Sequence, residues 1–403
     1  MTTYLTEDDI YRTSTQYRLW SFTPESLAAL REQTHAAAIE RAKKYLGHGN
    51  GTTGHSDGAN GNCEGDGTVA DCLTAEEELR LVQRYADQIR TTSDFFKWPV
   101  NVKATAVQYL HRFYLSNSTL TYPPRETYKC ALFLASKTEG VHMTLSEYAR
   151  RISTDAQLIL APEYKIIQAL RFTLDVRQPF RGLKGALMEL LNIAAGRGAV
   201  PQHSRTGKTG AELQTLMAEL PGVADGDRST WAAPAGAAAA DPRVLADRAH
   251  VAYGVARQIL DAPALLTDVY FLFTPPQIYF GALMLADSVL AGFYLSTKLA
   301  LESPVRGKVL ATIGACRDML GAWSPQGVMS KEERAGLEAR LERCRDPTTR
   351  DLVGAMAAEK RGGGDEGALD DGVAKRRKLE REKSMKEGED LFGPSLPTVG
   401  NAA

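Results

Sequence analysis

The sequence has 403 residues, a formal net charge of −1 and a hydrophobic content of 43%. This length allows two or three domains with a sizeable core, and the near-zero charge excludes bulk attraction to nucleic acid or to a membrane surface. The five cysteines are scattered and predict no disulfide framework. Residues 1–9 are polar and acidic, unlike a signal peptide, and no apolar run approaches the roughly 20 residues of a membrane span. We therefore expect a soluble intracellular protein.

The predicted elements are helices. Thr23 and Pro24 are typical of an N-cap and a first helical position, and Thr74 predicts a second start because three glutamates follow it in the first turn. A further helix is expected over residues 100–115, where apolar side chains recur at helical spacing. No segment alternates with period two for long, so the sequence requires no strand.

Two helices are apolar nearly all round, at residues 126–137 and 277–291, which predicts that each lies at the centre of a bundle. They contain Ala-Leu-Phe-Leu-Ala and Ala-Leu-Met-Leu-Ala, 151 positions apart. The same offset relates two further pairs: Pro124 with Pro275, and Tyr128 with Tyr279. We infer an internal repeat, and hence two small tandem bundles.

Three segments lack the apolar content needed to offset the entropy of ordering: residues 47–70, 196–242 and 359–403. They are expected to be loops or disordered segments. Residues 213–220, inside the second segment, are compatible with a short helix.

The sequence contains no recognisable catalytic, phosphate-binding or metal-binding motif. Thr206-Gly207-Lys208-Thr209 resembles the end of a phosphate-binding loop, but Gln202 stands where the motif needs its first glycine. Four possible metal ligands occur together without zinc-site spacing: His48, His55, Cys63 and Cys72. The common hydrolase, metalloprotease and kinase motifs do not occur. We expect no catalytic residue, no metal and no cofactor.

Residues 100–139 resemble the cyclin box. The stretches Arg-Phe-Tyr-Leu at 112–115 and Leu-Ala-Ser-Lys at 134–137 are similar to that family's most recognisable segments. The resemblance is closest to the transcriptional branch whose members activate CDK-activating kinase, and it covers roughly residues 17–355. Outside the box it rests on residues 20–23, 272–278 and 341–344.

The resemblance implies an all-α fold of two tandem cyclin-box bundles flanked by N- and C-terminal helices. The expected divisions are an N-terminal segment and helix at 1–46, a flexible loop at 47–70, a first cyclin box at 71–178, a second at 179–327 with an insertion at 196–242, a C-terminal helix at 328–358 and a disordered charged tail at 359–403.

In the cyclin family a lysine after the buried helix and a glutamate on a later helix bind the partner kinase, and apolar residues pack on its αC helix. By residue-by-residue match these are Lys137, Glu163, Ile167 and Phe172. From the residues alone, Lys137 is equally a favourable cation at a helix end and Glu163 a favourable first-turn acid. Apolar stripes such as the one containing Ile167 are usually core.

The resemblance implies a regulatory subunit that is not itself an enzyme. Its partners would be a cyclin-dependent kinase catalytic subunit and a RING-finger assembly factor, within a CDK-activating complex of general transcription factor IIH. That complex phosphorylates CDK activation loops and the C-terminal repeats of RNA polymerase II, so the expected location is the nucleus, with no direct nucleic-acid or membrane contact. A possible import signal, alternatively a solvated charged tail, is Lys375, Arg376, Arg377 and Lys378.

Two departures from the cell-cycle cyclins place substrate docking through the first box helix in doubt. The Met-Arg-Ala-Ile-Leu motif is replaced by Glu-Leu-Arg-Leu-Val at 78–82, and His111 stands where that family has an aspartate. Both fit a transcriptional cyclin. The alternatives are another transcriptional cyclin of the C, K or T type, a DNA-binding cyclin-fold transcription factor, or an unrelated helical scaffold. The DNA-binding type would need a zinc ribbon and a basic surface, and the sequence supports neither.

Overall fold

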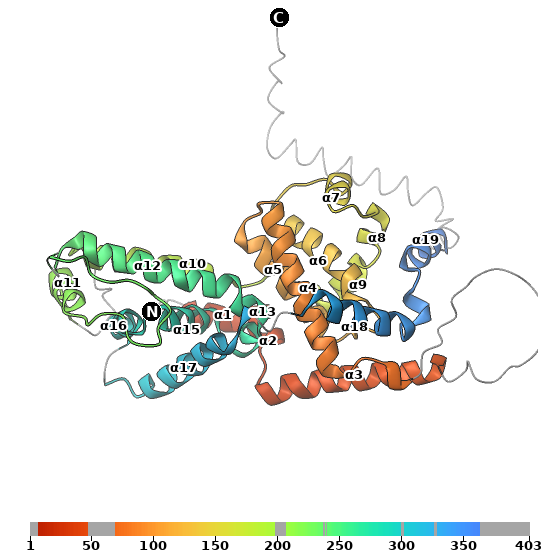
Figure 1. The fold of residues 1–403 in the computed structure, drawn as a ribbon, viewed down its shortest axis with the longest axis horizontal. Helices are drawn as coiled ribbons and strands as arrows, with labels where there is room; N and C mark the ends of the chain where they lie inside the picture. The colour runs from red at the N-terminus through yellow and green to blue at the C-terminus, as the bar shows by residue number, and fades with distance from the viewer. Residues whose placement is uncertain are drawn as a thin grey trace, which may run out of the picture. The chain divides into compact units, whose positions relative to one another are not determined.

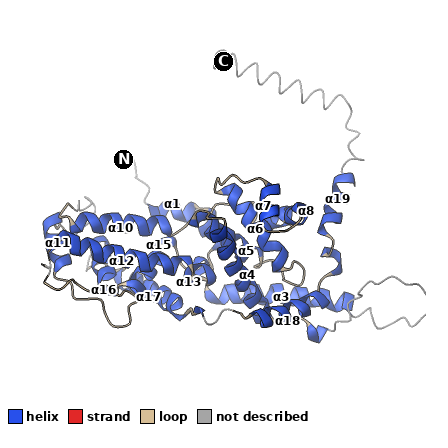
Figure 2. Cartoon of the chain, turned by 45° about the horizontal axis from the view of Figure 1, so that its top comes forward, coloured by secondary structure: helices blue, strands red, loops and turns tan. Residues whose placement is uncertain are grey.

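The computed structural model describes residues 7–46, 69–197, 207–236, 238, 240–299, 302–325 and 329–362. Within these ranges every regular element is a helix, which confirms the predicted all-α fold (Figure 2). The chain divides after Arg350 into two units, and the described part of the second is mainly helix α19 (Leu352–Gly362). Some residues considered above lie outside the described ranges. They are three of the four possible metal ligands, His48, His55 and Cys63, and the possible import signal, Lys375, Arg376, Arg377 and Lys378.

The N-terminal segment forms three helices: α1 (Glu7–Thr13), α2 (Thr15–Trp20) and α3 (Pro24–Leu46). Helix α3 begins at the predicted proline because Thr23 caps it, its Oγ1 accepting from the backbone N–H of Ser26 at 3.2 Å. Trp20 and Leu27 are buried against Leu115 of the first repeat and Phe271 of the second.

The first repeat is built around helix α6. Its helices are α4 (Ala75–Phe95), α5 (Val100–Phe113), α6 (Pro124–Thr138), α7 (Leu145–Arg151), α8 (Ala156–Leu160) and α9 (Glu163–Ala169). Thr74 and Glu77 form a capping box at the start of α4. Helix α6 packs against α4, α5, α8 and α9, and residues 130–136 are all buried, which is why that stretch is apolar on every side (Figure 1).

The second repeat repeats this plan around helix α15. Its helices are α10 (Phe180–Ala194), α12 (Pro242–Asp261), α13 (Pro263–Leu266), α14 (Val269–Leu272), α15 (Pro275–Ala286), α16 (Ser288–Lys298) and α17 (Arg306–Ala322). Helix α15 packs against α10, α12, α16 and α17 (Figure 1). The two central helices both start with a proline at the first helical position, Pro124 and Pro275.

The helix expected over residues 277–291 is interrupted, and that prediction was wrong in its extent. Helix α15 ends at Ala286 and α16 begins at Ser288. The break lies at Asp287, whose carboxylate accepts from the N–H of Leu290 at 2.9 Å and from the guanidinium of Arg248 at 2.8 Å. An aspartate that caps a new helix and pairs with a buried arginine favours this break over continuation of the helix.

Part of the insertion at 196–242, expected as loop or disordered chain, packs on the second repeat. Helix α11 (Gly210–Ala218) buries Leu213 and Met217 at helical spacing. Farther along, the backbone N–H groups of Arg228 and Ser229 donate to the carbonyls of Leu285 and Ala286, each at 2.9 Å. These carbonyls close α15 and have no partner within their own helix, so the insertion satisfies them.

The C-terminal helix expected over residues 328–358 is also not continuous. Helix α18 (Lys331–Arg343) is followed by a short 3₁₀ turn, η4 (Pro347–Thr349), and then by α19 in the second unit. Asp346 accepts from the N–H of Thr348, and the proline after it cannot continue a helical ladder. Arg345 binds Glu126 of α6 with two hydrogen bonds of 2.8 and 2.9 Å, which docks the turn on the first repeat.

Candidate functional site

The structure brings Lys137 and Glu163 together on the surface. Lys137 lies in the last turn of α6 and donates through Nζ to Oε1 of Glu163, in the first turn of α9. The two side chains are 43% and 22% exposed. Lys137 Nζ also lies 5.0 Å from the ring centroid of Phe133, one turn earlier. The pair is therefore positioned by its own fold yet accessible to a partner.

A glycine fixes the end of α6 beside this pair. Gly140 has φ +72°, and the N–H of Val141 donates to the carbonyl of Ser136 at 2.8 Å. This arrangement is the left-handed cap that commonly ends a helix, and a side chain at that position would be strained. Glu139 is held as well, because its carboxylate accepts from Thr105 Oγ1 at 2.6 Å.

The two apolar site residues have different environments. Ile167 is half-buried against the core, whereas Phe172 is 67% exposed. Phe172 follows Arg171, and both have left-handed backbones, with φ of 55° and 52°. The Phe172 N–H donates to the carbonyl of Ile167 at 3.0 Å and closes the end of α9. Bulky residues adopt this conformation only where the surroundings hold them, so the fold presents the Phe172 ring to solvent at a conformational cost.

The N-terminal segment braces this left-handed turn. The guanidinium groups of Arg112 and Arg171 both lie over the Trp20 indole, 5.0 and 5.3 Å from the ring centroid. Its Nε1 donates to Thr173 Oγ1 at 3.0 Å. Burial lowers the pKa of Arg112 to about 10, so the guanidinium stays charged at neutral pH. Sequence reasoning noted Trp20 only through the family resemblance and missed this contact, because nothing local links residues 20 and 171.

Further apolar side chains are exposed on α9 and on α8, the helix that precedes it. Tyr164, next to Glu163 on α9, is 55% exposed, and Leu158 on α8 is 54% exposed. Exposed large apolar side chains concentrated on neighbouring elements are typical of a protein-interaction surface.

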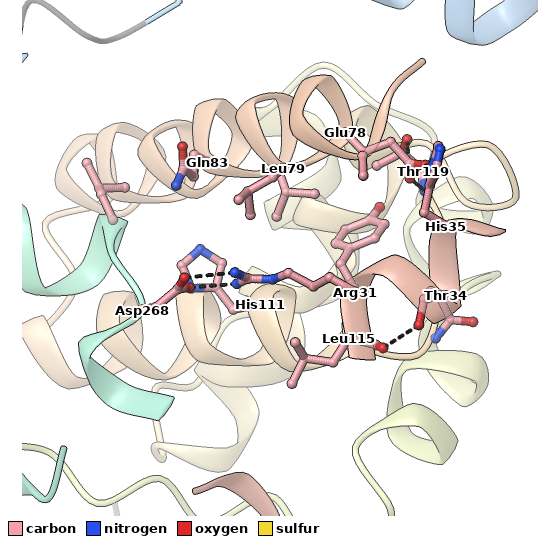
Figure 3. Close-up of a pocket in the computed structure, with 15 residues that line it drawn as sticks. Arg31, Thr34, His35, Glu78, Leu79, Gln83, His111, Leu115, Thr119 and Asp268 are labelled. Carbon is pink, nitrogen blue, oxygen red and sulfur yellow. Dashed lines mark hydrogen bonds and ion pairs between the residues drawn. The ribbon is translucent and has the colours of Figure 1, made fainter. Parts of the chain in front are cut away.

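A second polar cluster lies where α3 crosses the first repeat (Figure 3). Arg31 of α3 spans to Asp268 with two hydrogen bonds of 2.7 and 2.6 Å. Glu78 of α4 accepts from His35 Nδ1 at 2.6 Å and from the Thr119 N–H at 2.8 Å. These contacts fasten the N-terminal helix to both repeats.

His111 lies at the base of this cluster and is almost fully buried (Figure 3). Burial lowers its pKa to about 4, with the Asp268 carboxylate opposing the shift, so the imidazole is neutral near pH 7. The adjoining cavity has a volume of about 50 Å³, far below that of ordinary small-ligand pockets. The first box helix, where docking was placed in doubt, therefore faces α3 and a small cavity here.

Within the described ranges, no three His, Cys, Asp or Glu side chains are grouped so as to hold a metal ion. No described helix is long and apolar enough to span a membrane.

Comparisons with known proteins agree with this architecture. Residues 178–321 match the family profile of the cyclin C-terminal domain. A chain in the structure of the CAK complex from Chaetomium thermophilum bound to ATP-γ-S is 33% identical, with a TM-score of 0.66 over 91% of this chain and 98% of that one. The chain belongs to the cyclin family.

Several curated relatives of this cyclin are named cyclin H, and one of Arabidopsis thaliana is named Cyclin-C1-2. Cyclin CCL1 of Saccharomyces cerevisiae is 28% identical over 302 residues, which are 73% of this chain and 62% of the yeast protein. A probable cyclin-H of Echinococcus multilocularis is 31% identical over 215 residues, 51% of this chain and 62% of that protein. The matched regions thus span about three-fifths of the relatives' own lengths.

Proposed function

We propose that this cyclin is the regulatory subunit of a CDK-activating kinase and binds a cyclin-dependent kinase catalytic subunit. The observation that carries the proposal is the accessible Lys137–Glu163 ion pair at the start of α9, together with the exposed ring of Phe172 just beyond the end of the same helix. The likeness to a chain of the Chaetomium CAK complex supports it.

The surface suits recognition of a kinase helix. Lys137 and Glu163 offer a donor and an acceptor for backbone groups of the partner and so set its register, while Phe172 and part of Ile167 supply apolar area. Docking here would move the kinase αC helix inward, so that its glutamate reaches the lysine that holds the ATP phosphates. The cyclin supplies no reacting group and acts by its higher affinity for the active kinase conformer.

The same reasoning extends to a larger assembly. We infer a RING-finger assembly factor as a third subunit, membership of general transcription factor IIH, and a nuclear location. The substrates would then be CDK activation loops and the C-terminal repeats of RNA polymerase II. The cyclin H names of several curated relatives support this set of partners, and the match to Cyclin CCL1 runs over 302 residues against 123 for Cyclin-C1-2.

The test is affinity purification of the tagged full chain from its own cells, comparing wild type with Lys137→Ala/Glu163→Ala. Truncating a buried charged contact at an interface typically costs ~2–5 kcal/mol, so kinase recovery and activity on a polymerase repeat peptide should fall at least tenfold. Lys298→Ala/Glu189→Ala is the matched control, because it removes an exposed Lys–Glu pair between two helices of the second repeat.

Each outcome has a definite meaning. Loss of the kinase with the first variant and retention with the control supports the proposal. Equal loss with both variants contradicts the site assignment. A kinase recovered without any RING-finger protein indicates another type of transcriptional cyclin, and recovery of no kinase with the wild-type chain rejects the cyclin function.

A further inference from the structure

A polar cleft lies between helices α4, α6 and α18, with a volume of about 410 Å³. Three cationic side chains line it: Arg125 and Lys129 of α6, and Arg334 of α18. Its wall includes the rings of Tyr85 and Tyr128, whose centroids are 5.3 Å apart. The volume is in the range of small-ligand sites, so the cleft can hold a small charged group.

The positive charge in this cleft is only partly balanced by the protein. Arg125 and Lys129 are one helical turn apart on α6, a spacing at which like charges repel. Neither forms an ion pair within the residues that the structure describes, although Lys129 Nζ donates to the hydroxyl of Thr154 at 2.9 Å. Burial, together with the charge of Arg125, lowers the pKa of Lys129, and Glu126 opposes the shift only in part.

The nearest carboxylates are already occupied. Glu338 accepts a hydrogen bond from the Tyr85 hydroxyl and lies 3.6 Å from Arg334 Nε. Glu126, beside Arg125 in the sequence, is bound at both oxygens by Arg345. Three cations against one lining carboxylate leave the cleft with an excess of about two positive charges.

One of the lining arginines is not hydrogen-bonded through its Nε in the part of the chain that the structure describes. The Nε of Arg334 is shielded from solvent and has no hydrogen-bond partner among the described residues. Its nearest carboxylate oxygen is Oε1 of Glu338 at 3.6 Å, beyond hydrogen-bond distance, so the charge of Arg334 is only loosely paired.

We propose that this cleft binds the phosphate group of a phosphorylated serine or threonine in a partner protein. A phosphoryl group carries about −1.5 to −2 charge and three acceptor oxygens, which match the excess charge and the unmet donors better than one carboxylate does. Guanidinium groups combined with a lysine are the usual means of phosphoresidue recognition. A single cleft on a chain with net charge −1 fits one phosphate better than a nucleic-acid backbone, which needs an extended basic surface.

The cleft is separate from the proposed kinase-binding face. Lys129 and Lys137 are eight residues apart on α6, a rise of roughly 12 Å at 1.5 Å per residue. A phosphorylated partner would therefore bind while a kinase occupies the surface around Lys137 and Glu163. The inference does not depend on the proposed function, because it concerns the cyclin chain alone.

The test is fluorescence anisotropy of the full chain with a labelled peptide, Gly-Ala-phosphoserine-Ala-Gly, against its unphosphorylated form. Arg125→Gln/Lys129→Gln should weaken phosphopeptide binding at least tenfold, since two charge-assisted contacts are lost. The matched control is Lys184→Gln, an exposed lysine on α10 outside the cleft. Thermal melting should stay within a few degrees for both variants, because neither removes a buried ion pair.

Phosphate-dependent binding that the cleft variant loses and the control keeps supports the proposal. Binding that does not need the phosphate, or that the cleft variant retains, overturns it. Competition arms identify the source of the anion. Inorganic phosphate that competes as well as the phosphopeptide overturns recognition of a phosphoprotein in favour of a free anion, and tighter binding of a single-stranded RNA overturns it in favour of nucleic acid.

Discussion

Two surface ion pairs in this cyclin look alike, one in each repeat. Lys137 donates to Glu163 between α6 and α9, and Lys298 donates to Glu189 between α16 and α10. Each lysine also lies over an aromatic ring one turn earlier, Phe133 at 5.0 Å or Tyr294 at 5.3 Å. The geometry of the ion pair alone therefore does not distinguish a binding site from an ordinary solvent-exposed ion pair.

Their surroundings differ. Glu163 opens a short helix that ends in two left-handed residues and presents Phe172 to solvent. Glu189 lies within the long helix α10 and accepts a second hydrogen bond from the Tyr294 hydroxyl at 3.2 Å. We assign binding to the first repeat for two reasons. Helix α9, which carries Glu163, is followed by a strained, exposed aromatic residue, whereas Glu189 has a second partner inside the protein.

The largest expected effect on stability comes from a third pair, which is buried. Arg248 and Asp287 in the second repeat are 3% and 0% exposed, and Asp287→Ala would leave the arginine charge unpaired. We expect a loss of ~3–5 kcal/mol in the free energy of unfolding, measured by urea denaturation. Asp318→Ala, at an exposed pair, is the control. A loss below about 1 kcal/mol would show that burial does not separate structural pairs from surface pairs.

Acid should destabilise the first repeat through His111. Its pKa is about 4 in the folded protein, so below about 6.5 the unfolded chain binds a proton that the folded chain does not. Stability is therefore lost as the pH falls from about 6.5 to 4, by up to ~3 kcal/mol. Urea titrations at pH 7 and 4.5 should show a smaller fall for His111→Phe than for wild type. Equal falls would contradict a neutral His111.

His35 acts in the opposite direction in the same experiment. Its hydrogen bond to Glu78 raises its pKa, so its contribution is complete at low pH and is lost as the pH rises. His35 is present in both wild type and the His111→Phe variant, so the difference between their pH profiles reports on His111 alone.

Phe172→Gly should separate stability from binding. Glycine removes the cost of a left-handed backbone, so the protein should become more stable by about 1 kcal/mol, measured by thermal unfolding. Kinase affinity should fall about tenfold or more, because burying a phenylalanine side chain contributes ~1.5–3 kcal/mol. Lys97→Gly relieves similar strain outside the proposed site and should leave kinase affinity unchanged. If the Phe172→Gly variant were less stable and still bound the kinase, Phe172 would be a structural residue and not part of the binding surface.

The smallest effect is expected for the two exposed pairs themselves. Lys137→Ala/Glu163→Ala and Lys298→Ala/Glu189→Ala should each change the free energy of unfolding by less than about 1 kcal/mol. Parallel urea curves on the isolated chain check this. A much larger loss in the first variant alone would mean that its effect on kinase recovery reflects folding and not binding.

Much of the fold follows from local signals in the sequence. Thr74 followed by acids, Thr23 before Pro24 and the fully apolar stretches at 131–135 and 282–286 are strong because cap chemistry and burial depend on neighbouring residues. The failures have different causes. The break at Asp287 depends on Arg248, 39 residues away. The break after Arg343 follows instead from Asp346 and Pro347, local signals that the prediction overlooked, and the contact of Arg345 with Glu126 then docks the turn.

The candidate site shows the same division. The sequence, through its family resemblance, determined which residues to consider: Lys137, Glu163, Ile167 and Phe172. Only the tertiary structure decided that the first two pair, that Ile167 belongs partly to the core and that Phe172 points outward, braced by Trp20 through Arg171. Likewise Arg125, Lys129 and Arg334 are ordinary surface cations in the sequence and form one cleft only because α18 packs beside α4 and α6. Helix caps and the spacing of apolar residues depend on residues that are close in the sequence. The exposure of a side chain, backbone strain and charge imbalance arise from contacts between residues far apart in the chain.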